Sequence, residues 1–239
     1  MKASAIVVAA GVGRRLGMEI PKAFVELGGH ALLWYSLRTI AAVAGIDETV
    51  IAVPHGMERA ARAEAVAAHL EIPVKITPGG AERQDSVRLA LTLTSAESEM
   101  VVVHDAARPF ATAELFIRCL ERAAVAGGAI AAIPLADTLK RIRGNAADET
   151  WSERSATTIV ATIPRAGLWQ AQTPQAFRRD LLIAAHQRAL RENIAATDDA
   201  DLVEHIARVE VVESRVLNLK VTSHADLELA RAFVSRTPD

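Results

Sequence analysis

Apolar runs of strand length alternate along the chain with segments of helical period. Four runs in the first half are mostly apolar: "SAIVVAA" (4–10), "ETVIAV" (48–53), "VKITP" (74–78) and "MVVVHDA" (100–106). Amphipathic segments separate them, such as "HALLWYSLRTIAAV" (30–43) and "MERAARAEAVAAHL" (57–70). Continuous apolar strands that alternate with helices indicate a parallel sheet covered on both faces. The pattern therefore predicts an α/β fold with a Rossmann-like, doubly wound, mostly parallel sheet, which binds ligands beyond the carboxyl ends of its strands.

The second half adds three apolar runs and one stretch without helical period. The runs 128–136, 208–214 and 216–222 predict further strands, and the segments 178–193 and 223–234 predict helices. Between residues 137 and 177 Thr, Ile and Val recur at strand spacing on both sides of a turn-rich tip, "RGNAADE". We interpret about residues 137–160 as an extended β-arm, because this stretch is too short for its own core. Residues 1–239 are then predicted to form a single domain that includes the arm.

Composition narrows the class of protein. The 239 residues are 51% hydrophobic and 23% charged, which is typical of a globular protein. The net charge of −2 offers no general attraction for nucleic acid or an anionic membrane, and no apolar run approaches the roughly 20 residues of a membrane span. A single cysteine, Cys119, excludes an intrachain disulfide and predicts a cytoplasmic protein.

The first strand leads into a glycine loop with cations behind it, "AAGVGRRLGMEIPKAF" (9–24). It is not a Walker A loop, because Lys22 follows Pro21 rather than glycine. It is a poor dinucleotide loop, because Leu16 stands at the third glycine position and the second strand ends in Pro54 instead of an acidic residue. A plain tight turn would explain the glycines but not the cations. Lys22 and Arg15 beside backbone N–H groups suit a triphosphate.

Further motifs follow in order: "GGAERQDSV" (79–87), "VHDAARPF" (103–110), "DTLKR" (137–141), "LWQAQTPQAF" (168–177), "TDDA" (197–200) and "NLKVT" (218–222). With the glycine loop, this set resembles the 2-C-methyl-D-erythritol 4-phosphate cytidylyltransferases of the non-mevalonate isoprenoid pathway. The resemblance runs from about residue 5 to residue 236. It implies a fold of the nucleotide-diphospho-sugar transferase type and the transfer of CMP from CTP to 2-C-methyl-D-erythritol 4-phosphate. The implied products are 4-diphosphocytidyl-2-C-methyl-D-erythritol and pyrophosphate.

The resemblance also implies roles for individual residues. The implied catalytic residues are Arg15, Lys22, Arg165 and Lys220. The implied nucleotide-binding residues are Ala10, Gly11, Val12, Gly13, Arg15, Lys22, Gly80, Ser86, Asp105 and Ala106. The implied acceptor-binding residues are Arg108, Thr138, Arg165, Thr197 and Lys220, and Asp105 is the implied ligand of Mg²⁺. The attacking phosphate is already an anion near pH 7, so direct in-line displacement needs no general base.

Residue patterns alone leave plainer interpretations open for several of these positions. Asp105 ends a strand and could equally be a turn aspartate, and Lys220 in an apolar run is more often an edge residue. Ser86 could simply begin a helix, and Thr197 could cap one. By spacing alone Arg165 would be a solvated loop arginine.

The arm predicts a partner, because a two-stranded ribbon is marginal in water without something to pack on. The resemblance implies a homodimer in which Arg165 and Thr138 reach the neighbour's acceptor site; the alternative is an arm folded back on its own subunit. Two other functions stay open at this point. One is a ribitol 5-phosphate cytidylyltransferase and the other is a non-catalytic nucleotide-binding protein.

Overall fold

The computed structural model describes residues 1–11, 13, 20–143, 158–214 and 217–235. The chain divides into two compact units. The first comprises Met1–Ala132 and Ala171–Asp239, and the second comprises Ile133–Gln170. The glycine loop, Asp105 and Lys220 all belong to the first unit, whereas Thr138 and Arg165 belong to the second.

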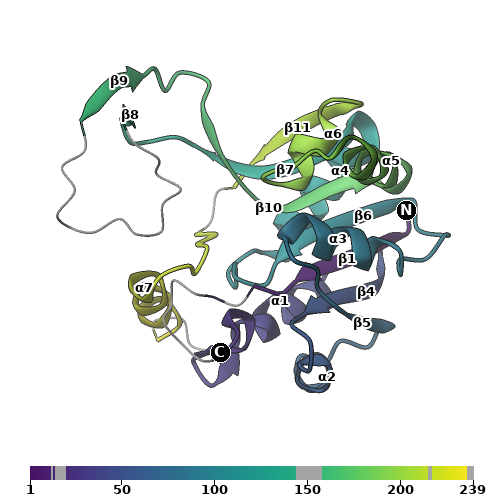
Figure 1. The fold of residues 1–239 in the computed structure, drawn as a ribbon. Coiled ribbons are helices and arrows are strands. Elements are labelled where there is room, and N and C mark those ends of the chain that lie inside the picture. The colour runs from purple at the N-terminus through teal and green to yellow at the C-terminus, as the bar shows by residue number, and fades with distance from the viewer. Residues whose placement is uncertain (12, 14–19, 144–157, 215–216, 236–239) are drawn as a thin grey trace. The chain divides into compact units, whose positions relative to one another are not determined.

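A mixed, mostly parallel sheet forms the centre of the fold (Figure 1). Its seven strands stand in the order β11-β7-β10-β6-β1-β4-β5. Their bounds are β1 Ala3–Val8, β4 Ile46–Val53, β5 Val74–Pro78, β6 Met100–Asp105, β7 Gly127–Pro134, β10 Trp169–Arg178 and β11 Arg208–Glu213. Strand β1 runs parallel to β4 and β6, β4 to β5 and β7 to β11, whereas β10 runs antiparallel to β6. This arrangement confirms the predicted fold class.

Helices cover both faces of the sheet, as the continuous apolar strands predict. Along β1, Val7 packs in a cluster with α1 (Leu32–Ala41), α2 (Glu58–Ala67) and α4 (Ala113–Ala126). The neighbouring Ile6 points to the opposite face and packs with α3 (Arg83–Leu91), α5 (Arg179–Glu192) and α6 (Asp199–Val203). Successive side chains of a strand alternate between faces, so both faces of a doubly covered strand must be apolar. Within the described part of the chain, no helix is long and apolar enough to cross a membrane.

A smaller cluster packs beside this core. It joins α7 (His224–Val234) to β2 (Glu26–Leu27), a short strand that pairs antiparallel with β3 (His30–Ala31). Ser223 and Asp226 form a capping box at the start of α7, so two otherwise unpaired N–H groups are satisfied. A 3₁₀ turn, η2 (Lys22–Phe24), directly follows Pro21.

The second unit contains the predicted hairpin. Strand β8 (Leu139–Ile142) pairs antiparallel with β9 (Ile159–Ile163), with Leu139 opposite Ile163. The tip residues 144–157 lie outside the described residues. The structure differs from the sequence prediction farther along, because most of "LWQAQTPQAF" forms strand β10 of the main sheet. Gln172 and Gln175 interrupt the apolar pattern of this strand. Both side chains are buried, and each is hydrogen-bonded to another side chain.

The predicted strand at 216–222 is wrong for the described residues 217–222, which form no ladder. Side chains hold this segment instead. The Asn218 amide donates to Gln172 Oε1 at 3.0 Å and to the Thr173 carbonyl at 2.8 Å. A backbone hydrogen bond from Val221 N to the Ala107 carbonyl, at 2.8 Å, fixes the segment beside the end of β6. Lys220 therefore projects from an irregular segment and not from a sheet edge.

Candidate active site

A cavity of about 490 Å³ opens in the first unit beyond the carboxyl ends of β1 and β6. Val8 at the end of β1 aligns with Asp105 at the end of β6, so the residues after both strands reach the same edge of the sheet. The volume is typical of a small-molecule site. The cavity is lined by Val8, Ala9, Ala10, Gly11, Lys22, Ala23, Gly80, Ala81, Glu82, Arg83, Ser86, Asp105, Ala106, Ala107 and Lys220. The structure thus brings together eight of the predicted site residues: Ala10, Gly11, Lys22, Gly80, Ser86, Asp105, Ala106 and Lys220.

The glycine loop and Lys22 form one side of the cavity. Gly13 has a φ of +68°, and a Cβ atom there would lie 2.9 Å from the Cβ of Lys22. Only glycine therefore allows the loop to pass so close to the start of η2. This close approach places Lys22 beside Gly11 in the cavity wall. Val12 and Arg15, both predicted to bind the nucleotide, lie outside the described residues.

Asp105 is the buried carboxylate of the cavity. Its backbone N–H donates to Thr173 Oγ1 at 3.0 Å. Its Oδ1 accepts a hydrogen bond from Arg83 Nε at 3.1 Å, and its Oδ2 accepts one from Lys220 Nζ at 2.7 Å. Burial alone would raise the pKa of Asp105, but the Arg83 and Lys220 charges outweigh it and hold that pKa well below the usual range. The carboxylate is therefore ionised at any physiological pH.

The adjacent His104 is fully buried, and its hydrogen bonds define its tautomer. The Arg108 carbonyl can only accept a hydrogen bond, so the neutral ring carries its hydrogen on Nε2, and Nδ1 accepts from the Thr173 hydroxyl at 3.0 Å. His104 Nε2 then donates to the Arg108 carbonyl at 3.2 Å. Burial lowers the pKa of His104 to about 4. His104 is therefore a neutral, structural histidine that aligns the backbone on either side of Asp105.

The loop before α3 also lines the cavity. Ser86 is 2% exposed, and its Oγ accepts from Gly80 N at 3.1 Å and donates to the Glu82 carbonyl at 3.1 Å. A Cβ atom on Gly80 would lie 2.2 Å from the Cβ of Asp85. Gly80 and Ser86 thus give the loop its shape, which leaves main-chain groups at the cavity surface. Asp85 and Glu82 complete a capping box that starts α3.

Arg83 is the residue of this cavity that sequence analysis missed. It begins α3, and its guanidinium joins Asp105 to Asp199 of α6, with 2.7 Å between Nη1 and Asp199 Oδ2. Both carboxylates hold the pKa of Arg83 above its usual value, although burial alone would lower that pKa. Arg83 stands in the motif "GGAERQDSV", but no local pattern indicates a partner 116 residues away.

Arg108 and Thr197 do not line the cavity. Arg108 is buried, and its Nη1 donates to the Asn218 carbonyl at 2.7 Å, so it supports the segment that carries Lys220. Its Nε is buried with no hydrogen-bond partner among the described residues. Thr197 is exposed and its backbone N donates to Asp201 Oδ2 at 3.1 Å. The N-cap of α6 is Asp198 and not Thr197.

Thr138 and Arg165 lie in the second unit, and both are exposed. The guanidinium of Arg165 donates to the Ala136 carbonyl. Beside it, Leu135 N donates to the Leu168 carbonyl at 3.0 Å. These hydrogen bonds join the segment just before β8 to the segment between β9 and β10, within the second unit.

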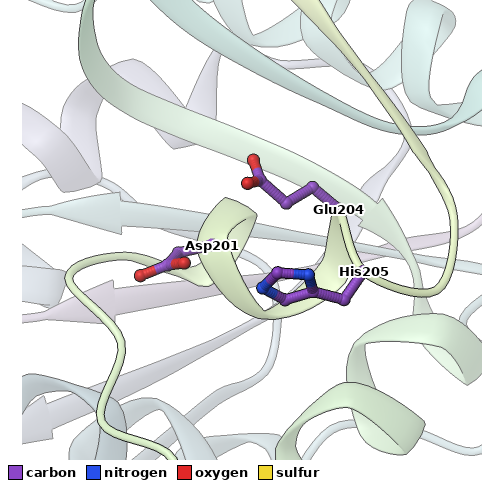
Figure 2. A group of neighbouring side chains, drawn as sticks. All are labelled: Asp201, Glu204 and His205. Carbon is purple, nitrogen blue, oxygen red and sulfur yellow. The ribbon is translucent and has the colours of Figure 1, made fainter.

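Among the described residues, we consider two places that offer oxygen ligands for a metal ion. Asp105 fits Mg²⁺, because it is an ionised carboxylate in a cavity, and Mg²⁺ uses few protein ligands together with phosphate oxygens. The second place is formed by Asp201, Glu204 and His205 on and just after α6, whose ligand atoms lie within 4.8 Å of one another (Figure 2). Asp201 Oδ2 there already accepts from Thr197, and the other two side chains are exposed. Asp105 is therefore the better candidate.

Known proteins of one family resemble this chain over almost its whole length. The family model described as IspD, 2-C-methyl-D-erythritol 4-phosphate cytidylyltransferase, matches residues 3–236. A Deinococcus radiodurans protein of that name is 42% identical over 97% of this chain and 89% of its own length. The crystal structure of a Thermus thermophilus enzyme of that name has a TM-score of 0.77 and 34% identity, over 98% of this chain and 100% of that one. The crystal structure of 4-diphosphocytidyl-2C-methyl-D-erythritol synthase from Anaerococcus prevotii has a TM-score of 0.81 and 28% identity, over 98% and 96%. The chain therefore belongs to the 2-C-methyl-D-erythritol 4-phosphate cytidylyltransferase family.

Proposed function

We propose that the cavity beside Asp105 is the site at which this cytidylyltransferase forms 4-diphosphocytidyl-2-C-methyl-D-erythritol from CTP and 2-C-methyl-D-erythritol 4-phosphate. One observation carries the proposal. A buried, ionised carboxylate and the lysine Lys220 share a cavity of about 490 Å³ with the glycine loop and with Lys22. This combination of one acid and several cations suits the transfer of a nucleotidyl group between phosphates.

The nucleotide would lie between the two loops. Main-chain groups of Ala10, Gly11 and Gly13, together with Lys22, would hold the phosphates; Val12, Arg15 and Ala106 complete the proposed set. The loop at Gly80 and Ser86 would take the cytosine base. The Ser86 hydroxyl hydrogen is directed to the Glu82 carbonyl, so the proposed contacts with the base come from the main chain that Ser86 holds in place.

The reaction is a direct displacement. An oxygen of the acceptor phosphate forms a bond to the α-phosphorus of CTP, and the bond from that phosphorus to the leaving pyrophosphate breaks. Lys22 and Arg15 would stabilise the negative charge that develops around the α-phosphate. Lys220 and Arg165 would hold the acceptor phosphate in line with the bond that breaks. Arg108 supports the backbone of the Lys220 segment, and Thr138 and Thr197 complete the proposed acceptor contacts.

Mg²⁺ is the proposed cofactor, and Asp105 is its proposed protein ligand. When bound, it would neutralise phosphate charge and orient the triphosphate. The low pKa of Asp105 supports this role, because the carboxylate needs no deprotonation before it binds a cation. The charge of the cation would repel the two cationic side chains that now contact Asp105, Arg83 and Lys220, so one of them would give way.

We also propose that both units act as one domain, 1–239, within a homodimer joined through the hairpin. Large apolar side chains of the second unit are exposed, namely Leu139, Ile159, Val160, Leu168 and Trp169. A two-stranded ribbon with such side chains gains stability from a partner surface. In this proposal Arg165 and Thr138 serve the acceptor site of the neighbouring subunit.

The compartment proposed for the enzyme is the cytoplasm. Its one cysteine, Cys119, is fully buried in α4. Burial raises the pKa of the Cys119 thiol to about 12, so this thiol is unreactive at neutral pH. A single inert thiol suits a reducing compartment.

Pyrophosphate release tests the proposed function. The purified protein is incubated with Mg²⁺ and CTP alone, with CTP and 2-C-methyl-D-erythritol 4-phosphate, and with CTP and ribitol 5-phosphate. We expect release only with 2-C-methyl-D-erythritol 4-phosphate. Release with ribitol 5-phosphate instead would identify the other cytidylyltransferase. Binding of CTP without release in any mixture would identify a nucleotide-binding protein and contradict the proposal.

A further inference from the structure

The Arg83 guanidinium lies between two carboxylates from distant parts of the chain. Its Nε is 3.1 Å from Asp105 Oδ1, and its Nη1 is 2.7 Å from Asp199 Oδ2. Arg83 begins α3 and Asp199 begins α6, so two helices on one face of the sheet are joined at the cavity. A planar guanidinium can hold two carboxylates at once in a fixed geometry, which a lysine cannot do.

Asp199 is itself held in place from three sides. It is 1% exposed, its Oδ1 lies 3.1 Å from His186 Nε2, and its backbone N donates to Gln175 Oε1 at 3.2 Å. Burial alone would raise the pKa of Asp199, but Arg83 and His186 outweigh it and lower that pKa. Asp199 is therefore a fixed, ionised anchor for Arg83, although it lines no part of the cavity.

The two cations on Asp105 differ in how firmly they are held. The Lys220 side chain is 39% exposed and projects from the irregular segment 217–222. The Arg83 side chain is 25% exposed and has the second carboxylate as an anchor. A lysine ammonium on a flexible stem can leave one oxygen for another partner, whereas displacing Arg83 would also break its bond to Asp199. Oδ1 of Asp105 is thus the fixed oxygen and Oδ2 is the exchangeable one.

We propose that Arg83 and Asp199 are positioning residues for cation binding by Asp105, an inference that rests on the proposed function of the cavity. Asp199 fixes the Arg83 guanidinium, Arg83 fixes Oδ1 of Asp105, and Oδ2 is thereby presented to a divalent cation when Lys220 gives way. Neither residue needs to touch the nucleotide. Residues that orient a metal ligand in this way typically change metal affinity about 10–100-fold when replaced.

The test measures CTP binding by calorimetry without acceptor, so that no turnover occurs, once with Mg²⁺ and once with a chelator. The variants are Arg83→Lys and Asp199→Asn, with Asp105→Asn as the reference that removes the ligand charge itself. We expect both variants to bind CTP as wild type does in the chelator and to lose most of the gain in affinity that Mg²⁺ gives wild type. In the transfer assay the Mg²⁺ concentration for half-maximal turnover should rise about 10–100-fold.

Matched controls separate this effect from general damage. Arg88→Lys changes another arginine of α3, which pairs with Asp85 at 3.2 Å, and Glu204→Gln changes an exposed carboxylate at the end of α6. Both should keep the wild-type response to Mg²⁺. Should Asp199→Asn fail to fold, the comparison of Arg83→Lys with Arg88→Lys decides the question alone.

The double variant tests whether Asp199 acts through Arg83. If it does, the double variant Arg83→Lys/Asp199→Asn should lose no more of the Mg²⁺ response than Arg83→Lys alone, because the effect of Asp199 is already lost with Arg83. If the fold-losses in Mg²⁺ response of the two single variants multiply in the double variant, this would overturn the proposal. So would a loss of CTP affinity in the chelator, since Arg83 would then contact the nucleotide directly, and so would a wild-type response to Mg²⁺ in both single variants.

The two proposals fail in different ways. If wild type releases no pyrophosphate from CTP and acceptor, the proposed function is wrong. If wild type does so with a clear response to Mg²⁺, and the variants respond equally, only the positioning roles of Arg83 and Asp199 are wrong.

Discussion

Around Asp105 in the first unit, buried charges meet opposite charges: its two carboxylate oxygens face Arg83 and Lys220, and Arg83 continues to Asp199. In the hairpin of the second unit, by contrast, Ile159 and Val160 are 59% and 54% exposed. Buried charges without partners are strongly destabilising, so a cavity must satisfy its charges within the chain or with a ligand. Exposed apolar side chains cost less in solvent and can be buried later against a second protein surface. In the proposed function, the nucleotide binds in a cavity built within one chain, whereas the hairpin associates with a second chain.

Replacing Lys22, in the cavity of the first unit, should have the largest effect on turnover. For Lys22→Ala we expect turnover to fall about 10²–10³-fold while CTP affinity falls much less, because Lys22 is proposed to act on the charge of the transition state. Steady-state kinetics and calorimetry measure the two quantities. Lys2→Ala, which breaks an exposed pair with Glu97, is the control. A folded Lys22→Ala enzyme with nearly wild-type turnover would remove Lys22 from the mechanism.

The neutral state of His104 should appear in the pH dependence of stability. The pKa of His104 is lowered to about 4 in the folded chain, whereas it is about 6.5 in the unfolded chain. Between pH 4 and pH 6.5 the unfolded chain therefore binds more protons than the folded chain. The free energy of unfolding should therefore decrease by up to about 3 kcal/mol as pH falls through this window.

Urea unfolding of wild type and His104→Gln at several pH values checks this. The variant should lose this part of the slope, and His55→Gln, which changes an exposed histidine, should keep it. If His104→Gln retains the full wild-type slope, then His104 does not have the low pKa that its burial indicates.

Charges placed on the hairpin should weaken association in the second region. Burying one large apolar side chain contributes about 1.5–3 kcal/mol, so Ile159→Glu with Val160→Glu should raise the dimer dissociation constant at least about tenfold. Sedimentation velocity over a range of concentrations measures this. Val66→Glu and Val125→Glu, at exposed positions of α2 and α4, are matched controls. Equal self-association of all variants would show that the hairpin is not the interface.

Local sequence patterns were enough for most of the fold. Apolar runs predict the doubly covered sheet, and the helical period of residues 223–234 predicts α7, because these features depend on neighbouring residues. The family motifs pointed to Asp105, Lys22 and Lys220, which the structure gathers in one cavity.

What sequence analysis missed depends on contacts between distant residues. Strand β10 is not predicted by the sequence pattern, because the buried glutamines Gln172 and Gln175 interrupt its apolar residues. Residues 217–222 read as a strand, yet the side chain of Asn218 and not a ladder holds them. The pairing of Arg83 with Asp199 spans 116 residues and has no local signal.

The central claim is that one site combines the cavity of one chain with Arg165 from another. Lys22→Ala and Arg165→Ala, each expected to be nearly inactive, are unfolded together in equal amounts and refolded, and native mass spectrometry confirms the mixed dimers. If Arg165 acts on the neighbouring subunit, each mixed dimer has one site with both defects and one intact site. Random pairing makes about half of the dimers mixed, so about a quarter of wild-type activity should return. If the mixed dimers form and no activity returns, every site keeps a defect, and the shared site is contradicted.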